Sequence, residues 1–146
     1  MNSRFSIAVH TLTLLAASPQ ERLTSEFIAA SVGTNPVVIR RQLSALREAG
    51  LVDSKGARKG GWELTREPAK IRLSEVKSAL GEEASFRMHR NEPHPDCMVG
   101  QNVRAALEAV YATVDKAVSK TLNQWTVQDM LAAVMRDGAQ KLSHCG

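Results

Sequence analysis

The chain has 146 residues, of which 43% are hydrophobic and 23% are charged, as is typical of one soluble domain with an appended element. Aromatic residues make up only 4%, which argues against a stacking platform for single-stranded nucleic acid. The two cysteines, Cys97 and Cys145, lie far apart, which excludes a zinc site built from thiolates alone. Neither a membrane-spanning stretch nor a signal segment is recognisable, so we expect a cytoplasmic protein that does not bind a membrane.

The positive charge is concentrated in the N-terminal half. Residues 1–66 contain nine Lys and Arg against five Asp and Glu, a net charge of +4, whereas residues 67–146 contain ten of each and are neutral overall. A localised basic surface is typical of proteins that bind a polyanion, although an ordinary solvated surface is the simpler alternative at this modest charge.

Three helices are predicted in the first fifty residues. Apolar residues at helical spacing predict the first over residues 3–17, with Ser3 as its N-cap. The second begins at Thr24 and closes at Gly33.

The third helix begins immediately after a tight turn. Thr34 or Asn35 is suited to cap it, and Pro36 occupies its first position, where the missing N–H costs nothing. We expect this helix to turn its apolar residues toward a core, to leave its arginines outside, and to stop at Gly50.

Two short strands are predicted next, at Leu51-Val52 and at Trp62-Glu63-Leu64. They flank a glycine-rich loop that holds the adjacent cations Arg58 and Lys59. The sequence therefore predicts a mostly α fold with a small β wing, in which residues 1–66 form a winged helix-turn-helix domain.

The remainder is predicted to connect this domain to two further helices. Residues 67–98 contain a short amphipathic helix over 73–80 and then a loop rich in proline and histidine, with a short extended piece around Phe86. Residues 99–146 contain a long helix and a last helix over about 126–136.

The long helix carries a repeat typical of helices that pair. Its apolar or small residues are separated alternately by four and three positions, the spacing that keeps one seam facing a partner helix. The seam residues are Val103, Leu107, Val110, Val114, Ala117 and Thr121. We expect this helix to form a homodimer.

Helix-turn-helix proteins bind double-stranded DNA because a helix fits the major groove, where each base pair displays a distinct pattern of hydrogen-bonding groups. The side chain of Asn35 can hydrogen-bond to adenine, and Val37 can contact the methyl group of thymine. Arg40 or Arg41 can form two hydrogen bonds to guanine or bind a phosphate. Neither arginine has an acidic residue three or four positions away along the chain, although merely solvated arginines are the simpler alternative. The residues expected to contact DNA are Asn35, Pro36, Val37, Arg40, Arg41, Ser44, Arg58 and Lys59.

Four segments together resemble one family of regulators. The segments are Thr34 to Arg41, Leu46 to Val52, Gly60 to Leu64 and Pro95 to Val103. In their order they resemble the Rrf family of winged-helix transcription regulators, the NsrR/IscR/CymR type, from the first helix to about residue 135. The resemblance implies homodimeric DNA-binding regulators, in which bases are read near Asn35 to Arg41 and the wing contacts the minor groove. We expect the homodimer to bind an imperfect palindrome. The resemblance also implies that many members carry an iron–sulfur cluster in the loop before the dimerisation helix.

The chain departs from the cluster-binding members of that family. Those members resemble one another in having three closely spaced cysteines in the loop, whereas residues 82–100 contain Cys97 alone. Some members add an aspartate from the first helix, where this chain has Ser6, and loop histidines such as His89 and His94 are more often solvated than ligating. We therefore expect no iron–sulfur cluster and no other cofactor, and the chain resembles the cluster-free, single-cysteine branch.

Cys97 is interpreted as a redox-responsive thiol. It precedes the long helix, whose dipole favours the thiolate, and His94 is nearby. The resemblance supports this reading, because the cluster-free branch includes thiol-based stress sensors. The opposing interpretation is a small buried hydrophobe. Cys145 suits either a frayed tail or a resolving thiol.

Other classes of function are less well supported. Cys97 and His94 lack an orienting acid and an oxyanion or cofactor motif, so we do not expect an enzyme. The alternatives to a transcription regulator that represses its target are a winged helix that binds protein or senses a metabolite, and an iron–sulfur-dependent regulator.

Overall fold

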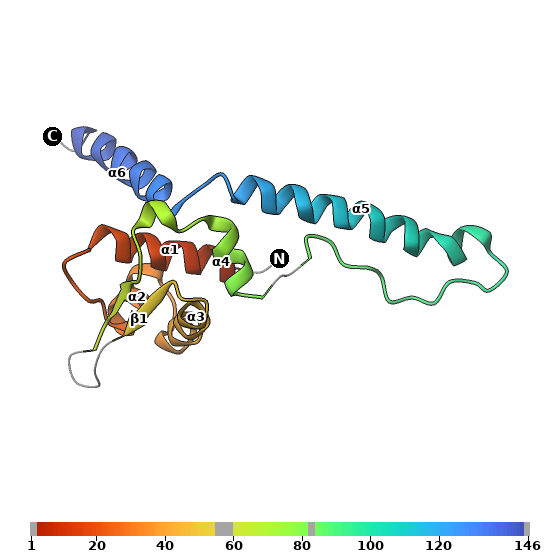
Figure 1. Cartoon of the computed structure of the whole chain (residues 1–146), viewed down its shortest axis with the longest axis horizontal. Helices are drawn as coiled ribbons and strands as arrows, with labels where there is room; N and C mark the ends of the chain where they lie inside the picture. The colour runs from red at the N-terminus through yellow and green to blue at the C-terminus, as the bar shows by residue number, and fades with distance from the viewer. Residues whose placement is uncertain (1–2, 55–59, 82–83, 145–146) are drawn as a thin grey trace.

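The computed structural model describes residues 3–54, 60–81 and 84–144. Its first helix, α1 (Arg4–Ala17), crosses the body of the molecule and buries Ala8, Leu12 and Leu15 along one side (Figure 1). Ser3 is the N-cap residue, as predicted, but its side chain makes no capping hydrogen bond.

The second and third helices form the predicted helix-turn-helix. The hydroxyl oxygen of Thr24 accepts a hydrogen bond from the N–H of Phe27 at 3.1 Å and so caps α2 (Ser25–Val32). This helix ends at Gly33, whose φ of +82° lies in the left-handed region that favours glycine. The chain can therefore turn directly into α3 (Pro36–Glu48).

The wing is a two-stranded antiparallel sheet of β1 (Val52–Ser54) and β2 (Trp62–Leu64), with Val52 opposite Leu64. The first strand begins one residue later than predicted. Leu51 is buried, and its N–H donates to the carbonyl oxygen of Leu46 at 3.0 Å. That N–H therefore closes the end of α3.

A 3-10 turn, η1 (Pro68–Lys70), leads to α4 (Leu73–Ala79), the short helix predicted over 73–80. The chain just before α4 pairs with the chain just before the last helix. The N–H of Val127 donates to the carbonyl oxygen of Ile71 at 2.9 Å, and the N–H of Leu73 donates to that of Trp125, also at 2.9 Å. These bonds attach the C-terminal part of the chain to the body.

The core lies between α1, α2, α3, α4 and the wing. Its largest fully buried apolar side chains come from all of these elements and from the start of the last helix. They are Leu12, Ile28, Ile39, Leu43, Leu46, Leu51, Val52, Ile71, Val76 and Val127. The packing of these residues holds the helix-turn-helix rigid.

Two helices complete the chain, α5 (Met98–Leu122) and α6 (Val127–His144). The long α5 projects from the body like an arm, while α6 packs against α1 (Figure 1). The predicted end of α6 near residue 136 is wrong. Gly138 remains helical, and neither a proline nor a left-handed glycine ends the helix there.

The segment between α4 and α5 returns along α5. The N–H of Ser85 donates to Oδ1 of Asp115 at 2.9 Å, and the rings of Phe86 and Tyr111 stack with centroids 5.5 Å apart. Among the described residues of this segment, none pairs as a strand. The extended piece predicted around Phe86 is therefore replaced by a loop held against the helix.

Candidate nucleic-acid interface

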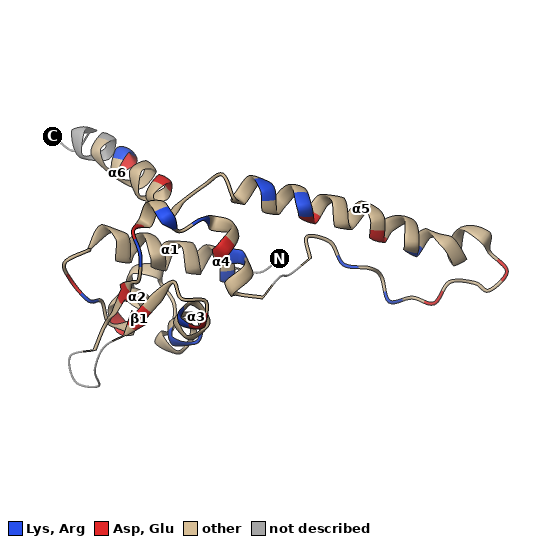
Figure 2. Ribbon diagram, in the orientation of Figure 1, with Lys and Arg blue, Asp and Glu red and all other residues tan. Residues whose placement is uncertain are grey.

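The exposed side of α3 carries three arginines. The exposed side chains on this side of α3 lie three or four positions apart. We call them the recognition face: Val37, Arg40, Arg41, Ser44 and Arg47. On the opposite side, Ile39, Leu43 and Leu46 are completely buried. Figure 2 shows the cluster of basic residues on α3. Core packing therefore decides which side of α3 faces solvent.

Arg40 has an acidic partner that its own helix does not contain. Its Nη2 donates to Oε1 of Glu26, in the first turn of α2, at 2.6 Å. A backbone N–H and the Arg40 guanidinium hold the pKa of Glu26 below its ordinary value. The inference from chain spacing that Arg40 is unneutralised is therefore wrong, because the carboxylate comes from the neighbouring helix. For Arg41, no ion pair is found within residues 3–54, 60–81 and 84–144.

Asn35 is occupied as the N-cap of α3. Its Oδ1 accepts a hydrogen bond from the N–H of Val37 at 2.9 Å. A two-bond contact with adenine needs both the amide oxygen and the amide nitrogen of the side chain. The cap already uses one lone pair of Oδ1 and fixes the direction of the side chain, so reading adenine with both atoms would have to be compatible with the cap or replace it. Pro36 is the first residue of the helix, as predicted.

The wing is attached to the body at β2. Trp62 forms a backbone bridge with Leu23, and the guanidinium of Arg47 lies over the Trp62 ring, 5.5 Å from its centroid. Nη2 of Arg22 donates to Oε1 of Glu63 at 2.9 Å. These contacts orient the wing relative to α3. Arg58 and Lys59 lie outside the described residues.

Sequence reasoning missed the contacts that connect the elements of this surface. Glu26, Arg22 and Trp62 each contact a residue more than ten positions away in the chain. The only available sequence signal was the presence of charged or aromatic residues beside predicted helix and strand ends.

Cys97 lies at the junction of the loop and α5. It is exposed, and its Sγ accepts a hydrogen bond from the N–H of Gly100 at 3.3 Å, which makes it the N-cap of α5. The interpretation of Cys97 as a buried hydrophobe is therefore wrong for the single chain. The backbone N–H of Cys97 also donates to the carbonyl oxygen of His94 at 3.1 Å.

The predicted seam lies on α5, where no residue is buried in the single chain. Val103, Leu107 and Val114 are half-buried, while Ala117 is exposed and Val110 is 55% exposed. The returning loop contacts Arg104, Tyr111 and Asp115, which lie on a different side of the helix. The loop therefore leaves much of the seam uncovered.

Two hollows lie away from the recognition face. A groove of about 690 Å³ runs between α1 and α6 and is lined mostly by apolar side chains, including Val9, Leu131 and Val134. His10 and Ser31 also line it, and Nε2 of His10 lies 3.1 Å from Oγ of Ser31.

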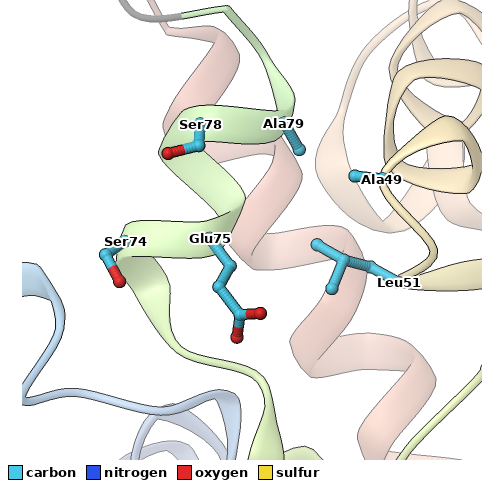
Figure 3. A pocket seen from close by; sticks show the side chains of 6 residues that line it. All are labelled: Ala49, Leu51, Ser74, Glu75, Ser78 and Ala79. Carbon is cyan, nitrogen blue, oxygen red and sulfur yellow. The ribbon is translucent and has the colours of Figure 1, made fainter.

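The second hollow, of about 350 Å³, separates α4 from the end of α3 (Figure 3). Glu75 lines it and accepts hydrogen bonds from the N–H of Arg72 and from Nη1 of Arg66, each at 2.9 Å. Burial raises the pKa of Glu75, but these two donors outweigh it and leave the pKa below its ordinary value of 4.5. The carboxylate of Glu75 therefore stabilises the start of α4 and has its hydrogen bonds within the protein.

A helix-turn-helix followed by an antiparallel hairpin, with basic residues on the second helix, defines a winged helix-turn-helix regulator. The sequence profile of the Rrf2 family, described as "Iron-dependent Transcriptional regulator", matches residues 1–133. The chain belongs to the Rrf2 family. It is a transcriptional regulator and not an enzyme, and the resemblance found in the sequence is confirmed.

Individual relatives agree with this assignment. YwnA of Bacillus subtilis (strain 168), provisionally named an HTH-type transcriptional regulator, is 38% identical over 132 residues, which cover 90% of this chain and 96% of YwnA. A crystal structure provisionally described as a DNA-binding protein has a TM-score of 0.72 and 34% identity, covering 88% of this chain and 99% of that one. IscR of T. potens has a TM-score of 0.69 at 23% identity, over 92% of this chain and 87% of IscR, and so shares the fold.

The iron in the family description finds no fitting set of ligands among the residues that the structure describes. Within residues 3–54, 60–81 and 84–144, no group of three or more His, Cys, Asp and Glu side chains is arranged to hold a metal ion. Cys97 is the one cysteine of those ranges, and a dimer would bring two such thiolates where a common two-iron cluster uses four. Ser6, on α1, is exposed and supplies no carboxylate. The described residues therefore provide no site for iron.

Proposed function

We propose that the protein is a homodimeric, sequence-specific DNA-binding regulator that represses by occupying an imperfect palindrome. The observation that carries this proposal is the recognition face, which presents three arginines on a helix whose other side is locked into the core. Each subunit would place the start of α3 in a major groove and the wing against the adjacent phosphates. Such a protein would act on chromosomal DNA in the cytoplasm. Among the described residues, no helix is long and apolar enough to span a membrane.

Selection from random duplexes followed by a salt titration tests DNA binding. We expect a palindromic motif to be enriched, and affinity to fall by about 0.9 log unit per log unit of salt for each phosphate neutralised. A wild-type protein that enriches no motif and binds no duplex at low salt would show that the winged helix serves another partner.

The dimer is proposed to form through the seam of α5. The helix α5 has 25 residues and none of its side chains is buried in the single chain. Because most of the stability of a helix in a protein comes from packing, we expect α5 to pack against a partner. The alternation of four and three along Val103, Leu107, Val110, Val114 and Ala117 suits a second copy of the same helix. A two-fold dimer also matches a palindromic site, because two recognition helices then read equivalent half-sites.

Cys97 is proposed to be the redox-sensing residue. Its sulfur is exposed and caps α5, so oxidation or alkylation changes the size and chemistry of the group that accepts from the N–H of Gly100. A change at the start of α5 can alter the angle between two subunits and hence the spacing of their recognition helices, which must match a turn of roughly 34–36 Å.

The test uses Cys97→Ser, in which the hydroxyl retains the ability to cap. Diamide or N-ethylmaleimide should release DNA from the wild type and not from Cys97→Ser. If mass spectrometry shows Cys97 modified while operator affinity is unchanged, the thiol is not the sensor.

A second candidate function is the sensing of a small apolar molecule in the α1–α6 groove. The groove lies within the roughly 300–1,000 Å³ range of small-molecule sites, and none of its lining residues is an aspartate, glutamate, lysine or arginine. We expect anilinonaphthalene sulfonate to bind there and Val134→Arg to abolish its fluorescence, whereas Ala132→Arg, outside the lining, should not. Equal fluorescence of both variants would dismiss this candidate.

A further inference from the structure

The ion pair between Glu26 and Arg40 connects the two helices of the helix-turn-helix. It runs from the first turn of α2 to the middle of the recognition face, with Nη2 of Arg40 2.6 Å from Oε1 of Glu26. The side chains are 53% exposed for Arg40 and 64% exposed for Glu26. The pair therefore sits on the surface that is proposed to meet DNA.

This ion pair is not needed to hold α2 against α3. Ile28 and Ala29 of α2 and Ile39 and Leu43 of α3 are buried and already pack the two helices together. Exposed ion pairs add little to folding stability, since solvent screens them and two long side chains lose freedom. What the pair does determine is the direction in which the Arg40 guanidinium points.

A carboxylate at this place has a cost for binding DNA. Glu26 is exposed, and a glutamate is ionised at neutral pH, so its negative charge repels phosphates. An arginine that only neutralised phosphate would bind better without it. An arginine that reads a base benefits from a neighbouring carboxylate that orients it. The planar guanidinium must have the right orientation to donate two parallel hydrogen bonds to guanine.

Arg41 provides the internal comparison. It is adjacent in the chain and equally part of the recognition face, and within the described ranges no carboxylate pairs with it. Its side chain is free to follow a phosphate wherever the backbone of the duplex lies. The two neighbouring arginines thus differ in how firmly they are oriented.

We propose that Glu26 is a positioning residue that determines sequence specificity, holding Arg40 so that its remaining N–H groups read a guanine while Arg41 contacts the phosphate backbone. This inference rests on the proposed DNA-binding function and adds to it a residue of α2 that need not touch DNA.

The experiment is selection from a random duplex library, with sequencing, for the wild type and three variants. Glu26→Gln removes the carboxylate, and Arg40→Lys keeps the charge of residue 40 but loses the planar fork. Glu48→Gln is the matched control: it removes one negative charge from the exposed end of α3, where no ion pair is found among the described residues. Circular dichroism confirms that each variant is folded.

We expect Glu26→Gln and Arg40→Lys to lose preference at the same base pair of each half-site, by about fivefold or more, as for the loss of one two-bond contact. Affinity for unrelated duplex should rise slightly in Glu26→Gln and in Glu48→Gln alike, while Glu48→Gln keeps the wild-type motif. An unchanged motif in Glu26→Gln, or a loss at a different base pair from Arg40→Lys, overturns the inference and leaves DNA binding intact. Absence of any enriched duplex with the wild type overturns the proposed function and this inference together.

Discussion

Replacing Val110 by glutamate tests the proposed dimer seam without disturbing the fold of the single chain. Val110 is 55% exposed on a helix with no buried residue, so the new carboxylate stays in water as long as the chain is alone. Glutamate is also a better helix former than valine. The substitution should therefore leave the core and the helix-turn-helix unchanged.

The proposed dimer should be affected differently, because two-fold symmetry would place one new carboxylate on each helix of the seam. Burying an unpaired charge costs several kcal/mol, so about 3 kcal/mol per chain amounts to about 6 kcal/mol per dimer. Since about 1.4 kcal/mol corresponds to a tenfold change, the dissociation constant should rise by about four orders of magnitude. A dimer with nanomolar affinity would then be largely monomeric at micromolar concentration.

Sedimentation velocity at micromolar concentration measures this effect, with Ala112→Glu as the control. Ala112 is exposed and lies half a turn away from the seam. We expect a dimer for the wild type and for Ala112→Glu, and a folded monomer with weak operator binding for Val110→Glu. The seam is wrong if Val110→Glu remains dimeric, or if Ala112→Glu dissociates just as readily.

Three further predictions concern the fold that supports the interface. In Gly61→Ala the new Cβ would lie 2.6 Å from Cβ of Arg22 and 2.8 Å from its backbone carbonyl carbon, so β2 must shift. We expect a lower melting temperature in thermal denaturation. An unchanged melting temperature would count against this close approach. Val127→Ala removes part of a completely buried side chain. It should lower the free energy of unfolding, measured in urea, by about 1–3 kcal/mol. A much smaller decrease would mean that Val127 does not anchor α6. Because the pKa of Glu75 is lowered in the folded chain, its ionised form stabilises the fold above the unfolded pKa, and that contribution is lost as the pH falls through the folded pKa. The stability advantage of the wild type over Glu75→Gln, below about 1 kcal/mol for a partly exposed pair, should be present at pH 7 and disappear well below pH 4.5; an advantage that does not change with pH would contradict it.

The sequence by itself determined the elements whose signals are local. Asn35 and Pro36 mark the start of α3, and Gly33 marks the end of α2, because capping involves backbone groups only a few residues away. Pattern also predicted the wing and the long helix, since side-chain periodicity reports which face of an element is apolar. The end of α6 was misjudged because the apolar spacing stops at Val134, whereas the helix continues to His144, and a single glycine is only a weak stop signal within a helix.

Only the tertiary structure decided how these elements meet. The carboxylate that neutralises Arg40 comes from Glu26, fourteen positions away, and the strand-like pairing of residues 71–73 with residues 125–127 joins segments separated by a whole arm. The exposure of Cys97 likewise depends on the loop running along α5 rather than into the core. Local propensity cannot specify such contacts, because they arise only when the packing of apolar faces brings distant segments of the chain together.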